Sequence, residues 1–447
     1  MFIFNTCLIQ GIFPDKLKIA KVIPIYKNKG DRDSPSNYRP ISLLPVMSKI
    51  FERLLHSQLY AYFEDHFLFN HSQYGFRKNR STEMATLEAK EYILRQMEEN
   101  IYTCGLFCDL TKAFDTIDHK ILIEKLKDYG VISTSLKLLE NYLANRHQCV
   151  TIHNSNSDLL EISRGVPQGS ILGPLLFLAY VNDFVNIDQS LKCVLFADDS
   201  NVFLSDKSLS NLTVRLQDFL DRLSRWCSAN VLFLNPNKTV FVLFRAKNKR
   251  QNINIDVYYE GCKINQTQEI KFLGVWFDEQ LTWQKHIETL ATKLRKVCGL
   301  IGRYRYIFPF KVKKIIYYSL FLSNVQYCCL VYTTATSTHL KSIYNLQKRF
   351  IRIMFNLDAY SSTSDYFDRH RFVSIFNISA HKIMQIFSQN RMLHYRNFLC
   401  SLGCLENYTQ VYNTRIVPHF IIPRPKREFS KQKICFVLPT ILNNCYM

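Results

Sequence analysis

Two adjacent aspartates, Asp198 and Asp199, lie between two short apolar runs, residues 192–197 and 200–204. Apolar, β-prone runs on either side of a short polar turn are typical of a β-hairpin. Two neighbouring carboxylates repel each other, and each is costly to remove from water without a partner. A hard divalent cation such as Mg²⁺ relieves both effects, because it binds carboxylate oxygens and keeps positions open for substrate phosphates. The alternative is a solvated turn without chemistry.

A third aspartate, Asp109, ends a near-continuous apolar run over residues 101–108. Such a run is typical of a buried strand, and a carboxylate at the end of a strand can hold a ligand on a rigid edge. Asp109 is far from Asp198 in the sequence. The chemistry therefore requires that the strands carrying them meet at one edge of a sheet.

Seven short motifs occur around these aspartates in a fixed order: NYRPISLL at 37–44, QYGFR at 73–77, DLTKAFD at 109–115, RGVPQGS at 164–170, FADD at 196–199, NPNKT at 235–239 and FLGV at 272–275. Together they resemble the reverse transcriptases of non-LTR retrotransposons, which are LINE-like elements, here of the jockey type. This resemblance covers the front three-fifths of the chain.

The resemblance implies an α+β fold, the right-hand polymerase fold with fingers, an antiparallel-sheet palm and a helical thumb. We expect fingers over residues 1–100, incomplete at their N-terminal side, and a palm with the metal site over 101–285. We expect a thumb over 286–356, where twelve Lys and Arg residues stand against one acid, Glu288. Residues 357–447 are a C-terminal extension to which the sequence assigns no role.

The resemblance also implies roles for individual residues. Two Mg²⁺ ions, with Mn²⁺ as a substitute, would be held by the three aspartates and the backbone carbonyl of Leu110. Lys238 would protonate the leaving pyrophosphate, and the ring of Phe114 would exclude a 2′-hydroxyl and so select deoxynucleotides. The remaining expected contacts are Lys27, Arg39, Arg77, Gln168 and Gly169 with the nucleotide, and Phe272, Leu273 and Gly274 with the primer end.

The composition fits a polyanionic partner. The chain has 57 basic and 37 acidic residues and a formal net charge of +20. An excess of this size favours nucleic acid, here an RNA template and a DNA primer extended with dNTPs. The 14 cysteines are scattered, several of them within apolar strands, which favours reduced thiols in an intracellular protein, nuclear or cytoplasmic. Residues 315–338 are long enough to span a membrane, but their polar content favours a buried helix and loop.

The sequence also predicts individual elements. Ser81 and Asp118 are expected to cap helices that start at residues 82 and 119. Further predicted helices cover 43–65, 175–184, 209–229, 312–331 and 339–355, and predicted strands cover 20–27, 230–237, 240–244 and 272–276.

Three alternatives to an active retrotransposon polymerase remain. The chain could be an inactive remnant, a domesticated nucleic-acid-binding protein, or another RNA-templated polymerase of intron or viral origin. No endonuclease motif precedes the polymerase motifs. Target cleavage is therefore expected from a missing upstream domain or a separate protein.

Overall fold

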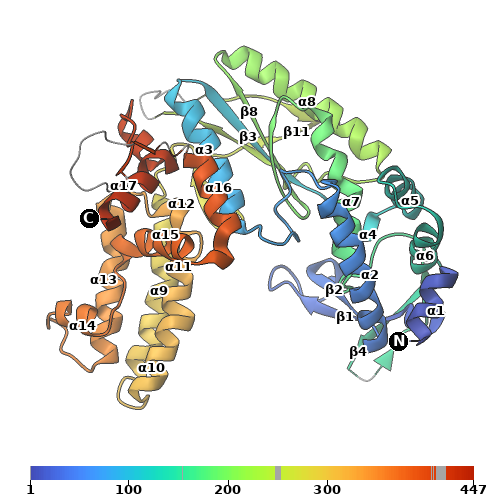
Figure 1. Ribbon diagram of the computed structural model, residues 1–447, viewed down its shortest axis with the longest axis horizontal. Coiled ribbons are helices and arrows are strands. Elements are labelled where there is room, and N and C mark those ends of the chain that lie inside the picture. The colour runs from blue at the N-terminus through green and yellow to red at the C-terminus, as the bar shows by residue number, and fades with distance from the viewer. Residues whose placement is uncertain are drawn as a thin grey trace.

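The computed structural model describes residues 2–153, 155–246, 253–403, 405, 407–408 and 419–446. It is a mixed α and β structure (Figure 1). Two of the three expected aspartates, Asp109 and Asp199, lie at strand ends in its central sheet. No helix within the described residues is long and apolar enough to cross a membrane.

The central sheet has five strands in the order β12-β9-β3-β8-β7. Its neighbours are antiparallel except for β12 and β9, which run parallel. The strands are β3 (Tyr102–Asp109), β7 (Lys192–Phe196), β8 (Asp199–Asp206), β9 (Val240–Phe244) and β12 (Asn265–Gln266). The register pairs Tyr102 with Asp206 at one end of the β3–β8 ladder and Asp109 with Asp199 at the other.

Helices cover both faces of this sheet. Side chains of β3 alternate between two cores, with Leu106 packing in one and Phe107 in the other. The first core contains α8 (Leu209–Ala229) and α7 (Gly173–Val181), and the second contains α3 (Thr82–Glu98). Burial on two faces explains why residues 101–108 are almost continuously apolar.

A second sheet of five strands is built around β1 (Ile19–Tyr26), β2 (Tyr38–Leu43) and β4 (Arg146–Ile152). The strand β1 pairs antiparallel with β2 and parallel with β4, so residues 146–152 join a sheet that is otherwise made from the N-terminal part of the chain. The smaller strands β5 (Ser155–Asn156) and β6 (Leu160–Ile162) pair with β4. The helices on this side are α1 (Phe2–Gln10), α2 (Val46–Asp65), α4 (Ala113–Thr116), α5 (His119–Asp128) and α6 (Ser133–Leu143).

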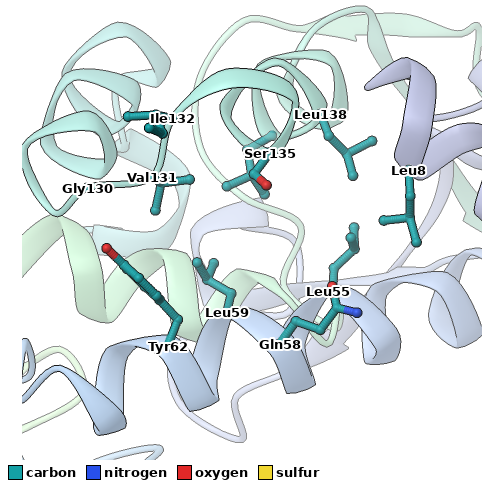
Figure 2. A pocket seen from close by; sticks show the side chains of 11 residues that line it. Leu8, Leu55, Gln58, Leu59, Tyr62, Gly130, Val131, Ile132, Ser135 and Leu138 are labelled. Atoms are coloured by element: carbon teal, nitrogen blue, oxygen red, sulfur yellow. The ribbon is translucent and has the colours of Figure 1, made fainter.

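An apolar cavity of about 300 Å³ lies between α2 and the α5–α6 connection, where Leu59, Val131 and Leu138 point toward one another (Figure 2). An apolar pocket is the usual first candidate for a binding site, but it normally contains a few convergent polar groups. No charged side chain lines this cavity, and none of the residues expected to carry chemistry contributes to it. This cavity therefore lacks the groups that the expected chemistry needs.

Helices dominate the region after residue 283. The elements are α9 (Gln284–Arg303), α10 (Phe310–Ile316), α11 (Ser323–Gln326), α12 (Cys329–Tyr332) and α13 (Ser337–Met354), and α9 packs along α13. The continuous helix predicted over 312–331 is wrong. A π-helical segment, Tyr317–Leu322, follows α10, and Cys328 has a left-handed backbone (φ 49°) that separates α11 from α12.

The described part of residues 357–447 packs in the same core as α3 and the helices from α9 to α13. Glu83 of α3 accepts a hydrogen bond from the hydroxyl of Tyr395 and forms an ion pair with Lys382. Near the other end of α3, Glu98 pairs with Lys433. The elements are α14 (Ser364–Arg369), α15 (Ile378–Ser388), α16 (Leu393–Gly403), β15 (Asn407–Tyr408), β16 (His419–Phe420) and α17 (Ile434–Tyr446).

Candidate active site

Three carboxylates come together at one end of the central sheet. Asp109 at the end of β3 is the register partner of Asp199 at the start of β8. Directly opposed residues of an antiparallel pair have Cα atoms about 4.5–5.5 Å apart. Asp198 precedes Asp199 in the turn that joins β7 to β8, in which Phe196 pairs with Asp199. The sequence prediction that these strands meet at one edge is therefore confirmed.

The turn between β7 and β8 is strained and braced. Ala197 has a left-handed backbone (φ 57°), which costs a residue with a side chain on the order of 1 kcal/mol. The side-chain oxygen of Gln73 accepts hydrogen bonds from the backbone N–H groups of Ala197 (3.1 Å) and Gly75 (2.8 Å). A Cβ atom on Gly75 would overlap the backbone nitrogen of Ala197, so only glycine fits against the turn. The QYGFR motif thus holds the aspartate turn in place.

The electrostatics of the turn indicate a place for a cation. Partial burial, followed by repulsion from Asp198 and Asp109, raises the pKa of Asp199 to about 6. Burial also raises the pKa of Asp198, and Asp109 adds to that shift while Arg39 opposes it. The ammonium of Lys238 lies 3.4 Å from a carboxylate oxygen of Asp109. Two of the three acids therefore resist ionisation. A divalent cation bound between them would stabilise their ionised forms.

Asp115, to which the sequence assigned no chemistry, orients the expected nucleotide contact Gln168. The amide nitrogen of Gln168 donates to a carboxylate oxygen of Asp115 (2.9 Å), and the Gln168 carbonyl accepts from the Ser42 N–H (2.8 Å). Gly169 has a φ of 126°, and a Cβ there would lie 2.6 Å from the Ser42 carbonyl oxygen. Burial raises the pKa of Asp115. The signal for Asp115 was its place in the DLTKAFD motif.

The ring of Phe114 is held from two sides. It stacks on Phe177 of α7, with ring centroids 4.4 Å apart, and meets the ring of Phe76 edge-on at 6.2 Å. Phe114 is half-buried, whereas Phe76 is 52% exposed. These two rings therefore fix the position of the Phe114 ring and leave part of its surface accessible.

The three expected triphosphate contacts differ. Arg39 on β2 is exposed and close enough to Asp198 to influence its ionisation. Lys27 is also exposed, although its ammonium donates to the Ser36 carbonyl. The guanidinium of Arg77 instead binds Glu64 through two nitrogens (3.1 and 2.8 Å) and the Asn70 carbonyl through the third. With only 8% of its side chain exposed, Arg77 is a structural residue, and this argues against the expected phosphate contact.

The comparisons with known proteins agree with this geometry. Residues 25–277 match the family model described as reverse transcriptase (RNA-dependent DNA polymerase), which is more than half of the chain. The chain belongs to the reverse transcriptase family. All the aspartate, Gln168 and Lys238 positions discussed above fall within the matched range, and the predicted resemblance is confirmed.

Two curated relatives of this reverse transcriptase chain are polymerases of Drosophila melanogaster mobile elements. It is 31% identical to the probable RNA-directed DNA polymerase from transposon X-element over 79% of this chain, and 30% identical to the RNA-directed DNA polymerase from mobile element jockey over 81%. These matches cover 39% and 40% of the relatives, so the chain spans about two-fifths of their length. Apo telomerase from Candida tropicalis aligns at 11% identity over 86% of this chain and 62% of that one, with a TM-score of 0.44.

The residues expected at the primer end form a hairpin turn in this reverse transcriptase, not the continuous strand predicted over 272–276. β13 (Glu269–Phe272) pairs with β14 (Val275–Asp278), and the turn residues Leu273 and Gly274 both have positive φ, 44° and 85°. Such two-residue hairpin turns favour glycine. The Tyr327 hydroxyl donates to the Leu273 carbonyl (2.7 Å), which links the turn to the helices after it. Phe272 itself is buried.

Membership of this family implies dependence on a divalent metal ion. No group of three or more His, Cys, Asp or Glu side chains in the described part of the chain is close enough to enclose an ion by itself. The backbone carbonyl of Leu110 is a further candidate donor. The hydrogen bonds from Thr111 N–H to Phe233 and from Asn235 N–H to Asp109 flank Leu110 but do not use its carbonyl. Oxygen donors of this kind fit Mg²⁺, which keeps positions for phosphate and water.

Proposed function

We propose that the chain is an RNA-directed DNA polymerase of a non-LTR retrotransposon that adds dNTPs to the 3′ end of a DNA primer on an RNA template. The observation that carries the proposal is the meeting of Asp109, Asp198 and Asp199 at one end of the central sheet. Phosphoryl transfer requires little covalent chemistry from the protein, so positioning and charge stabilisation supply the rate.

The metal would be held by the three aspartates together with the Leu110 carbonyl. Two Mg²⁺ ions, or Mn²⁺ in their place, would activate the primer hydroxyl and neutralise charge on the phosphates when bound. The protein's contribution is to hold the acids at this point, through the β3–β8 register and the Gln73 contact with Ala197.

The nucleotide would lie against basic, amide and aromatic side chains of the family motifs. Arg39 and Lys27 would bind the triphosphate, because guanidinium and ammonium groups are good donors to phosphate oxygens. Gln168, fixed by Asp115, and the backbone at Gly169 would contact the nucleotide. The Phe114 ring would exclude a ribose 2′-hydroxyl. Lys238 would donate a proton to the leaving pyrophosphate from its position beside Asp109.

The template and primer would follow the basic helices. In this proposal residues 1–100 are the fingers, 101–285 the palm and 286–356 the thumb. The thumb has twelve basic residues and one acid, and the basic residues would neutralise backbone phosphates. This neutralisation contributes most of the affinity of proteins for nucleic acid. The Phe272–Gly274 turn would hold the primer end, and Tyr327 would fix this turn to the thumb. The endonuclease would come from a segment beyond this sequence or from a separate protein, within the nucleus or cytoplasm where template RNA is present.

The test is extension of a labelled DNA primer on an RNA template by the purified chain with Mg²⁺. We expect extension with dNTPs that stops with EDTA, and none from Asp198→Asn, which should still fold and bind RNA. Asp158→Asn, an exposed aspartate in the loop between β5 and β6, is the control and should extend normally. Full extension by Asp198→Asn would refute the metal assignment. Binding that tolerates EDTA without any extension by wild-type protein would favour the inactive remnant or nucleic-acid-binding alternatives.

A further inference from the structure

A second cleft lies between the first half of the chain and its C-terminal region. Its volume is about 660 Å³, and its walls are α2, the segment after Phe76, and α16. The family match ends at residue 277, so α16 lies outside it. The cleft is therefore a composite of the family domain and a helix of the region to which the sequence assigned no role.

The first wall of the cleft carries two available cations. Arg77 is neutralised by Glu64, as described above, whereas Lys78 and Arg80 form no ion pair with any described residue. The Lys78 ammonium lies 5.4 Å from the ring centroid of Tyr60, and the Arg80 guanidinium lies 5.2 Å from that of Tyr74. Contacts between cations and rings orient the two side chains without cancelling their charge. This wall therefore has a net positive charge.

The opposite wall offers uncharged hydrogen-bonding groups and an aromatic ring. His394 and Asn397 are exposed and lie three residues apart on α16, so they share a face of the helix. The half-buried ring of Phe398 lies beside them. A groove that combines cations with amide, imidazole and aromatic groups has the chemistry of sites for single-stranded nucleic acid, whose phosphates and unstacked bases are both accessible.

The cleft connects to the candidate active site through one short segment. Gly75 packs against the backbone of Ala197 in the aspartate turn, and the exposed ring of Phe76 meets Phe114. From Gly75 to Arg80 the chain can extend no more than about 18 Å, since each residue spans at most about 3.6 Å. At the duplex spacing of about 3.4 Å per nucleotide, a nucleic-acid strand covers that distance with about five nucleotides.

We propose that this cleft binds the backbone of the unpaired RNA template strand within about five nucleotides of the active site. The identity of the strand rests on the proposed polymerase function. Lys78 and Arg80 contact its phosphates, and α16 closes the other side. The C-terminal region would thus help to hold the template and not merely support the thumb.

The test measures binding of the full chain to RNA–DNA hybrids by fluorescence anisotropy, without dNTPs. The hybrids have a fixed duplex and template 5′ overhangs of zero to ten nucleotides. We expect wild-type affinity to rise with overhang length and to level off near five nucleotides. The Lys78→Ala/Arg80→Ala variant should lose this rise and keep its affinity for the blunt hybrid. For the overhang hybrid, the slope of log K against log salt concentration should become shallower by about 1.4 in this variant, since each single-strand phosphate contact contributes about 0.7 to the slope.

Two further variants complete the design. Lys120→Ala/Lys127→Ala removes the same charge from exposed positions of α5 and should retain the rise with overhang length. His394→Glu/Asn397→Asp adds negative charge to α16 and should reduce the rise, which tests whether both walls take part. Thermal denaturation checks that each variant is folded.

The proposal is overturned if the Lys78→Ala/Arg80→Ala variant binds every overhang hybrid as tightly as wild type does. It is also overturned if the variant loses as much affinity for the blunt hybrid as for the overhang hybrids. A rise that follows an overhang on the primer strand instead of the template strand overturns the assignment to the template. The binding assay is separate from catalysis. If the rise depends on Lys78 and Arg80 but the wild-type chain extends no primer, the proposed polymerase function is refuted, and the cleft remains a site for an unpaired nucleic-acid strand.

Discussion

The clearest consequence of the aspartate cluster is that the chain should become more stable when one of its acids is removed in the absence of metal. The pKa of Asp199 is raised from 3.8 to about 6, first by burial and then by Asp198 and Asp109. A carboxyl whose pKa is higher in the folded than in the unfolded protein costs stability wherever it is ionised. At pH 7.5 the folded state therefore carries a penalty that Asp199→Asn removes.

The size of this penalty follows from the shift. A rise of about two pKa units corresponds to about 3 kcal/mol at 1.36 kcal/mol per unit. Asp199 remains partly open to water, which screens its repulsion, so we expect a gain of about 1 kcal/mol. The gain should be complete above pH 6 and shrink as the pH falls from 6 toward 4, because Asp199 then becomes protonated in the wild-type protein as well.

The assay is chemical denaturation of wild type and Asp199→Asn in EDTA at pH 7.5 and pH 5, repeated with Mg²⁺ at pH 7.5. Asp158→Asn is the control. We expect the variant to be more stable than wild type in EDTA at pH 7.5 and less so at pH 5. Mg²⁺ should stabilise wild type more than the variant, since it binds the ionised acid. A variant that is less stable than wild type in EDTA, or an equal response of both proteins to Mg²⁺, would refute the reasoning.

Three other substitutions test the supports of the site. Gly75→Ala forces the aspartate turn to shift, because its Cβ overlaps Ala197, and should lower kcat for primer extension by about 100-fold in a chain whose circular dichroism is unchanged. Phe114→Ala should raise the ratio of NTP to dNTP kcat/KM by at least about tenfold, and an unchanged ratio would exclude a steric role. Tyr327→Phe removes the hydrogen bond to Leu273 and should raise KM for the hybrid about fivefold, the equivalent of about 1 kcal/mol. KM for dNTP should not change. An equal rise in KM for the hybrid and in KM for dNTP would count against a role specific to the primer turn.

Local signals in the sequence were reliable where neighbouring residues decide the structure. The hydroxyl of Ser81 accepts from the Met84 N–H, and the carboxylate of Asp118 accepts from the N–H groups of the next turn, as predicted for both caps. The helix predicted over 209–229 is α8 with the same bounds. The predicted strand over 230–237 is wrong, since its backbone pairing is limited to one bridge at Leu234.

The contacts that the sequence did not reveal join residues that are distant in it. In the sequence Arg77 resembles a phosphate-binding arginine, but in the structure its guanidinium pairs with Glu64. The supporting role of Gln73 depends on Ala197, which is 124 residues away. The motifs locate both residues within the family pattern, but neither composition nor periodicity says which side chain each one meets.

The links between α3 and the end of the chain bear on how the protein matures. Glu91, fully buried in α3, accepts a hydrogen bond from the N–H of Ile434, which is 343 residues away. A ribosome must therefore translate 343 further residues before this buried acid can find its partner. Contacts over such separations form slowly and leave apolar surface open in the meantime. The core around α3 is thus expected to complete its folding only after α17 has been synthesised, and truncation within α17 should yield a protein prone to aggregation even though every catalytic motif is present.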